Sequence, residues 1–151
     1  MEKQISIGII QPADIPFVWG DVAEIVMQHS GGGSGSDSIL SLMSLDSLLR
    51  NLIKGDLNLW LATDENELEL AMICGWEEHE FVKYYHLVWL GGENLKKYLK
   101  LGLEVLEQYA CLNGAKELVL AGRDGWGRTL EPYGFVARKR WVKNVKVCWR
   151  N

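Results

Sequence analysis

The apolar positions of this 151-residue chain change period several times along its length, and each change marks a predicted element. Short runs rich in β-branched and aromatic residues predict strands, whereas apolar residues at i, i+3, i+4 and i+7 predict helices. The predicted strands cover residues 5–10, 57–62, 68–76, 81–90, 117–121, 135–141 and 145–149. The predicted helices follow residues 14 and 44, run over 95–112, and form a short turn at about 127–133. The order is therefore β-α-α-β-β-β-α-β-α-β-β.

Capping and turn residues set the predicted boundaries. Asp14 is a suitable N-cap for the first helix, with Pro16 just inside it, and Gly55 suits the left-handed stop of the second helix. The polar segments 63–67 and 77–80 link three strands as an antiparallel meander, and Lys143-Asn144 is the predicted turn of a C-terminal hairpin. Together these elements predict an α+β fold around a mostly antiparallel sheet.

The length fits one domain spanning residues 1–151. Within it, residues 30–38 contain mostly glycine and serine, a composition typical of a flexible connection. Two roles stay open for this segment: a surface loop, or a mobile lid over a ligand site.

Composition excludes several classes of protein. Cys74, Cys111 and Cys148 form no CxxC pair, which favours reduced thiols, a cytoplasmic location and no metal site. No apolar run approaches the roughly 18 residues of a membrane span. The seven Trp residues fill the core or mark an interaction surface, where Trp is enriched.

Charge is divided unevenly along the chain. Residues 1–121 carry a net charge of −10, whereas residues 122–151 carry +6. A basic end on an acidic body either attracts a phosphate-bearing or acidic partner or is simply a solvated face. Since neither a helix-turn-helix nor an RNA-binding signature is present, nucleic acid is disfavoured as the partner.

Three groups of residues could carry chemistry. His86 lies in the strand 81–90, where it is either a catalytic base or a satisfied core histidine. The segment 77–80, Glu-Glu-His-Glu, reads more readily as a solvated turn than as a site. Arg123, Trp126 and Arg128 form a basic-aromatic cluster that could bind phosphate, stack on a base, or pair with acidic groups of another subunit.

The element order, with Tyr133-Gly134-Phe135 after a short helix, resembles the GNAT superfamily of acyl-CoA-dependent N-acyltransferases. The segment from Gly122 to Phe135 also looks like small GNAT-like proteins of tailed bacteriophages. The resemblance implies acetyl-CoA as cofactor and an amine as acceptor. It further implies His86 as a base and Tyr133 as the acid that protonates the departing thiolate.

Family members hold the CoA pyrophosphate with backbone N–H groups between the fourth strand and the helix that follows. The corresponding residues here are Leu90, Gly91, Gly92, Asn94 and Lys96, with Arg128 as a further phosphate-binding candidate. The alternative for the glycine pair is a tight turn, with the neighbouring glutamate favourable near a helix N-terminus.

Two functions are therefore expected. The first is an acyl-CoA-dependent N-acyltransferase. The second is a catalytically inactive GNAT-like protein with a structural or interaction role, through protein partners or a homo-oligomer, and associated with a phage virion.

Overall fold

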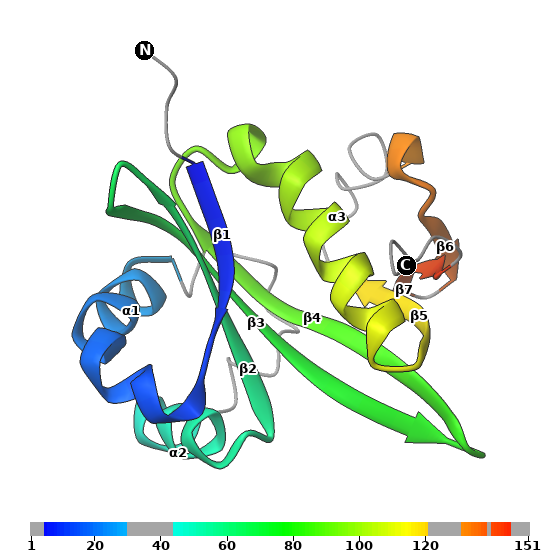
Figure 1. The fold of residues 1–151 in the computed structure, drawn as a ribbon, viewed down its shortest axis with the longest axis horizontal. Helices are drawn as coiled ribbons and strands as arrows, with labels where there is room; N and C mark the ends of the chain where they lie inside the picture. Colours follow the sequence, from blue (N-terminus) through cyan, green and yellow to red (C-terminus); the bar gives the residue numbers. More distant parts are fainter. Residues whose placement is uncertain (1–4, 30–43, 121–130, 139, 146–151) are drawn as a thin grey trace.

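The computed structural model describes residues 5–29, 44–120, 131–138 and 140–145 (Figure 1). Its strands are β1 (Ile5–Ile10), β2 (Leu57–Asp64), β3 (Glu67–His79), β4 (Val82–Gly92), β5 (Ala115–Leu120), β6 (Val136–Arg138) and β7 (Arg140–Asn144). Its helices are η1 (Pro12–Asp14), α1 (Ile15–His29), α2 (Leu45–Lys54), α3 (Leu95–Leu112) and η3 (Glu131–Tyr133). No helix in these ranges is long and apolar enough to span a membrane. The Gly/Ser segment 30–38 lies outside the described residues.

The seven strands form one sheet in the order β1-β2-β3-β4-β5-β7-β6. Every neighbouring pair is antiparallel except β4 and β5, which are parallel and joined through α3. Parallel neighbours need a crossover of this kind, because their connection must return to the same end of the sheet. The predicted α+β fold around a mostly antiparallel sheet is confirmed.

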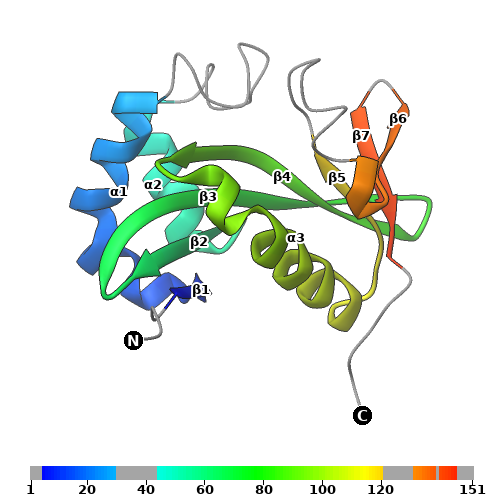
Figure 2. The same ribbon diagram turned by 90° about the horizontal axis from the view of Figure 1, so that it is seen from above.

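The helices cover the two faces of the sheet separately (Figure 2). α1 and α2 pack on one face over a cluster that includes Leu59, Ile73 and Trp89. α3 packs on the other face over a larger cluster that includes Tyr85, Leu87 and Leu118. Because successive strand residues point to opposite faces, both clusters draw on the same strands.

Two inserted residues break this alternation. In β3, Leu68 packs with the α1 and α2 cluster and Leu70 with the α3 cluster, although they are two residues apart. The register explains this, since Thr63 pairs with Leu68 and Ala62 with Leu70, so Glu69 is an extra residue. A β-bulge of this kind bends a strand and redirects its side chains. The Glu69 side chain is thereby turned toward the N-terminus of α3.

In β4 the extra residue is Val88, because Leu87 pairs with Cys74 and Trp89 with Ile73. Val88 and Trp89 are consecutive and both pack with the α1 and α2 cluster, as a bulge allows. β4 therefore changes course just beyond the part that pairs with β5.

Several predicted boundaries are confirmed. α3 covers residues 95–112 as expected. Ser44 caps α2 by accepting from the Ser47 N–H at 3.1 Å, and Gly55 ends this helix at φ 85°. α1 begins directly after Asp14, with Pro16 in its first turn.

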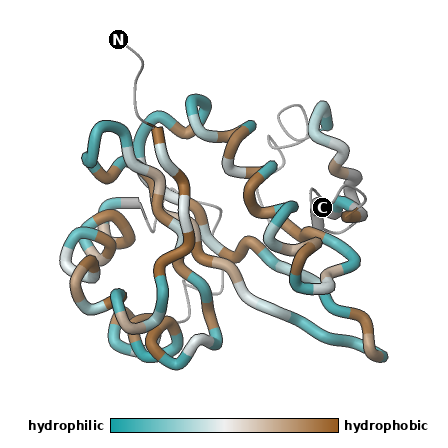
Figure 3. Tube along the Cα trace, in the orientation of Figure 1, coloured by the Kyte–Doolittle hydropathy of each residue, from teal (hydrophilic) through white to brown (hydrophobic). Residues whose placement is uncertain are grey.

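The prediction of a polar turn at 77–80 was wrong. Glu77, Glu78 and His79 belong to β3, and the turn is made by Glu80 and Phe81 at φ 52° and 70°. These polar residues occupy a two-stranded ribbon that extends past β2, whose pairing with β3 reaches only Gly75 (Figure 1). A ribbon that no helix covers needs no apolar face, so its sequence resembles a turn. Figure 3 shows this two-stranded ribbon as mostly hydrophilic.

The C-terminal hairpin also differs from its prediction. β6 ends at Arg138 and β7 begins at Arg140, whereas Lys143 and Asn144 lie inside β7 and pair with β5. The predicted turn at Lys143-Asn144 was therefore wrong, because docking on β5 keeps this segment extended. Of the predicted helix at 127–133, the described part is the 3-10 turn η3.

Candidate functional site

β4 and β5 pair over only part of their length. Their ladder runs from Lys83 opposite Ala115 to Leu87 opposite Leu120. Beyond this point, the part of β4 that ends at Gly92 pairs with β3 within the described ranges. Figure 2 shows the two strands diverging there, with α3 across the sheet face beside them. The fold thus creates an apex at Leu87 from which two parallel strands separate.

His86 lies one residue before this apex, opposite Val119 of β5. Its neighbours in β4 point into the α3 cluster, so the imidazole faces the opposite side of the sheet. His86 Nδ1 lies 3.7 Å from Glu77 Oε1, and the His86 side chain is 15% exposed. The Glu77 carboxylate thus faces the Nδ1 side of the imidazole.

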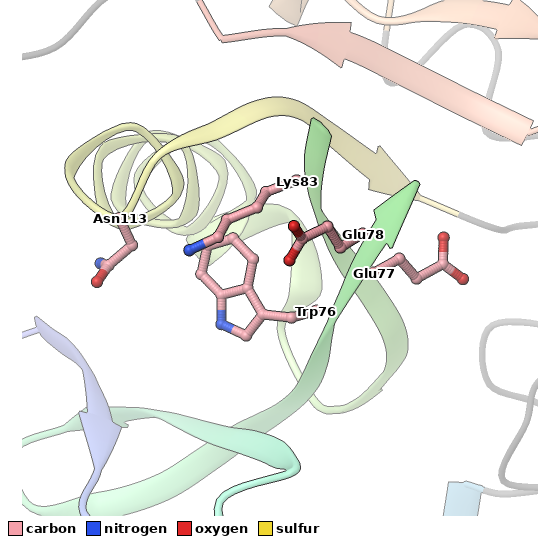
Figure 4. Close-up of a pocket in the computed structure, with 5 residues that line it drawn as sticks. All are labelled: Trp76, Glu77, Glu78, Lys83 and Asn113. Carbon is pink, nitrogen blue, oxygen red and sulfur yellow. The ribbon is translucent and has the colours of Figure 1, made fainter. Parts of the chain in front are cut away.

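Glu77 leaves the β3–β4 ribbon on the side opposite its two neighbours. Figure 4 shows Trp76, Glu78 and Lys83 gathered beside Asn113 at the end of α3, with Glu77 directed away from them. These residues line a hollow of about 440 Å³, in which Lys83 Nζ lies 6.0 Å from the Trp76 ring. Glu77 also lines this hollow, but its carboxylate points away from the other side chains and lies near His86.

Tyr133, the second predicted catalytic residue, ends η3 and packs against the α3 cluster. It lines a hollow between α3 and β7 together with Glu107 and Lys143, whose carboxylate and ammonium groups are 2.8 Å apart. Tyr133 and His86 therefore face opposite sides of the sheet, and the structure does not bring them together.

The glycine pair belongs to β4, so the alternative of a tight turn at Gly91-Gly92 was wrong. Gly92 pairs with Leu70 at φ 135°, and a Cβ there would lie 2.2 Å from the Glu69 carbonyl oxygen. Gly92 is required because β3 and β4 approach too closely for a side chain. The Glu93 N–H then donates to the Glu69 carbonyl at 2.8 Å, which occupies one N–H of the loop.

The N-terminus of α3 holds a carboxylate from the chain itself. Lys97 Nζ and the Tyr98 hydroxyl donate to Glu69 Oε1 at 2.8 Å and 2.5 Å, and the Asn94 amide donates to Glu69 Oε2. Lys97 also pairs with Asp64 at the end of β2. These donors, Lys97 first, lower the pKa of Glu69 from 4.5 to about 2.

A charged hollow of about 440 Å³ lies beside this cluster, between α1 and the ends of β3 and β4. Five carboxylates line it, those of Asp21, Glu24, Glu67, Glu69 and Glu93. An anion that approached the start of α3 from this side would meet a strongly negative potential.

The remaining predicted residues are dispersed. Leu90 is 7% exposed and packs in the α3 cluster, so its side chain is part of the core. Asn94 adopts a left-handed conformation at φ 59° and holds Glu69. Lys96 is exposed in the first turn of α3. Arg128, with its neighbours Arg123 and Trp126, lies outside the described residues.

The fold is that of GNAT acetyltransferases. A predicted acetyltransferase from Clostridium acetobutylicum, solved with acetyl-CoA, superposes with a TM-score of 0.63 at 12% identity over 91% of this chain and 94% of its own. Glucosamine-6-phosphate N-acetyltransferase from Arabidopsis thaliana gives 0.63 at 14% identity over 89% and 93%. Ribosomal-protein-alanine N-acetyltransferase from Brucella melitensis gives 0.65 at 14% identity over 89% and 92%.

At these identities the likeness establishes the fold alone. No protein-family model matches the sequence, and no curated protein matches it. The cofactor must therefore be tested against the residues of this chain. Glu69 lies at the start of α3 and engages side-chain donors there, and four further acidic residues line the hollow beside it. The acidic residues at the junction of β4 and α3 therefore do not fit a pyrophosphate.

Glu69 is the residue of this region that sequence reasoning missed. Asn94, Lys97 and Tyr98 stand three and four residues apart, the spacing that places side chains on one helical face. That spacing could have indicated a shared partner. The partner is 25 or more residues away, and a bulge directs it there, so the pairing is not visible in the sequence.

Proposed function

We propose that this chain is a GNAT-fold N-acyltransferase that moves an acyl group from a thioester to an amine. The observation that carries this is the His86–Glu77 pair beside the apex where β4 and β5 separate. The acetyltransferase fold supports the same reaction class, since fold raises the prior while the site must supply the chemistry.

In this proposal His86 is the general base. The attacking nitrogen must lose a proton as the new amide bond forms, and an imidazole is the side chain best suited to accept it near neutral pH. Glu77 is a positioning residue, because its carboxylate lies 3.7 Å from Nδ1 and leaves Nε2, which is buried, as the atom that would accept the proton. No step is assigned to Tyr133, which faces the other side of the sheet.

An acyl-transfer assay on the whole chain tests this function. The protein is incubated with acetyl-CoA or with acetyl-pantetheine, a thioester without the nucleotide, and with a panel of primary amines. Mass spectrometry then detects the acylated amine. Amide formation that requires the protein supports the proposal, and its absence with both donors at millimolar concentration contradicts it.

A second function is favoured by one observation at the ribbon tip. Phe81 is 96% exposed and sits at φ 70°, a conformation that glycine or asparagine adopts more readily. An exposed aromatic held in a costly conformation fits a contact residue of an interaction protein. This function includes the virion component that the phage resemblance implies.

Light scattering separates this second function from the first. A stable oligomer that Phe81→Ser disperses supports the interaction role through copies of the chain. A monomer that forms amides contradicts it.

A further inference from the structure

We infer that Glu69 is an internal substitute for the ligand phosphate at the start of α3, and that it makes the chain discriminate against nucleotide-bearing thioesters. The inference rests on the proposed function only where it names the thioester that would donate the acyl group. The affinity for coenzyme A can be tested whether or not the chain transfers an acyl group.

The first step is the position of the carboxylate. A helix N-terminus offers partial positive charge and N–H donors, which is why phosphates bind there. Here the side chains of Asn94, Lys97 and Tyr98 at the start of α3 donate to Glu69, so a carboxylate of the chain itself lies beside this positive end. A phosphate that bound these side chains would have to displace the Glu69 carboxylate.

The second step is that the backbone fixes this arrangement. Glu69 is the extra residue of the β3 bulge, and its carbonyl accepts the Glu93 N–H at 2.8 Å. Gly92 allows β4 to approach this carbonyl closely. Glu69 is therefore held from both its main chain and its side chain, which a freely rotating surface glutamate is not.

The third step is charge. Lys97, in the first turn of α3, is shared between Asp64 and Glu69, and their carboxylates raise its pKa. Two carboxylates therefore face the single positive charge of Lys97. A pyrophosphate that approached from this side would face Glu69 and the other carboxylates of the acidic hollow.

Isothermal titration with coenzyme A and with pantetheine tests the inference, because these probes differ by the nucleotide and its phosphates. The wild-type chain should bind pantetheine at least as tightly as coenzyme A. Glu69→Ala should tighten coenzyme A by about tenfold, since one like charge is removed and Lys97 is released, and should leave pantetheine unchanged. Glu69→Gln, which keeps the shape, should gain part of this effect.

The matched control is Glu67→Ala. It removes an exposed carboxylate from the same hollow and leaves the Glu69 contacts with α3 in place. It should change coenzyme A affinity by less than about threefold. The inference is overturned if the wild-type chain prefers coenzyme A by about tenfold or more, if Glu67→Ala equals Glu69→Ala, or if neither Glu69 variant gains affinity.

Thermal melts of the variants guard against a trivial result. If Glu69→Ala does not fold, the smaller gain of Glu69→Gln decides the question. Acyl transfer is not measured here, so an inactive protein leaves the result standing. Equally, failure of the affinity change leaves transfer from small thioesters untouched.

Discussion

Gly92 stands directly against Glu69, such that a Cβ on Gly92 would lie 2.2 Å from the Glu69 carbonyl oxygen and 2.7 Å from the Leu70 Cα. Both atoms belong to the backbone of a central strand and cannot move aside cheaply. We expect Gly92→Ala to lower the free energy of unfolding by about 2–4 kcal/mol, through clash and strain at φ 135°. Urea denaturation measures this change.

Gly20 provides the opposite case for comparison. It lies within α1, and a Cβ there meets no atom within 4 Å. Gly20→Ala should therefore stabilise the protein by about 0.5–1 kcal/mol, because alanine has the higher helix propensity. Equal effects of the two substitutions would contradict the close approach at Gly92.

Acid should weaken the protein through Glu69. Its pKa is about 2 in the folded state and 4.5 as the ordinary value, so the unfolded state binds the proton first. The stabilisation is complete above about pH 4.5 and is lost as the pH falls toward 2. Between pH 5 and 2, wild-type stability should fall more steeply than that of Glu69→Gln. Glu67→Gln, at an exposed position, should follow the wild type.

Tyr85 links two polar groups inside the α3 cluster. Its hydroxyl accepts from Trp60 Nε1 at 2.9 Å and donates to Asn58 Oδ1 at 2.8 Å, and Tyr85 is fully buried. Tyr85→Phe should cost about 1–3 kcal/mol of stability, because the Trp60 N–H loses its partner. Tyr84→Phe, on the opposite face of the strand, should cost less than half of this. Thermal melts of the two variants measure the difference.

His86 and Glu77 make separable kinetic predictions for acyl transfer. His86→Gln should lower kcat by about 100-fold, the loss expected for a general base. Glu77→Gln should lower kcat by about tenfold with KM unchanged, since it orients the ring without touching substrate. Tyr133→Phe should retain activity within about twofold.

The reverse result would exchange these roles. If Tyr133→Phe abolished transfer and His86→Gln did not, the base would have to be sought on the α3 side of the sheet. Circular dichroism of each variant establishes that the comparison is between folded proteins.

Periodicity predicted the elements that bury one continuous face. The apolar stripe of α3 gave both of its ends, and Ser44 and Gly55 gave the ends of α2, because these signals are local. The β3–β4 ribbon was shortened in the prediction, since polar residues on an uncovered ribbon resemble a loop. Lys143 and Asn144 were assigned to a turn, because only docking on β5 reveals that they are extended.

The candidate site was predictable in part for the same reason. His86 could be chosen from its residue type and strand, but its pairing with Glu77 depends on the register of β3 and β4. The glycine pair was predicted to follow the strand but belongs to β4, and the role of Gly92 depends on how closely β3 approaches it. Glu69 could not be found, because a one-residue bulge decides where its carboxylate points.

The single parallel pair in the sheet bears on how the chain folds. Residues 57–92 form an antiparallel meander whose strands meet through short turns, so their pairing closes small loops. β5 is joined to β4 through the whole of α3, and it gains a ladder of five residue pairs. Contacts that close late and over a long span are slow to form. The seam between β4 and β5 should therefore assemble after the meander and open before it, and amide protons of β5 should exchange with solvent sooner than those at the centre of β3.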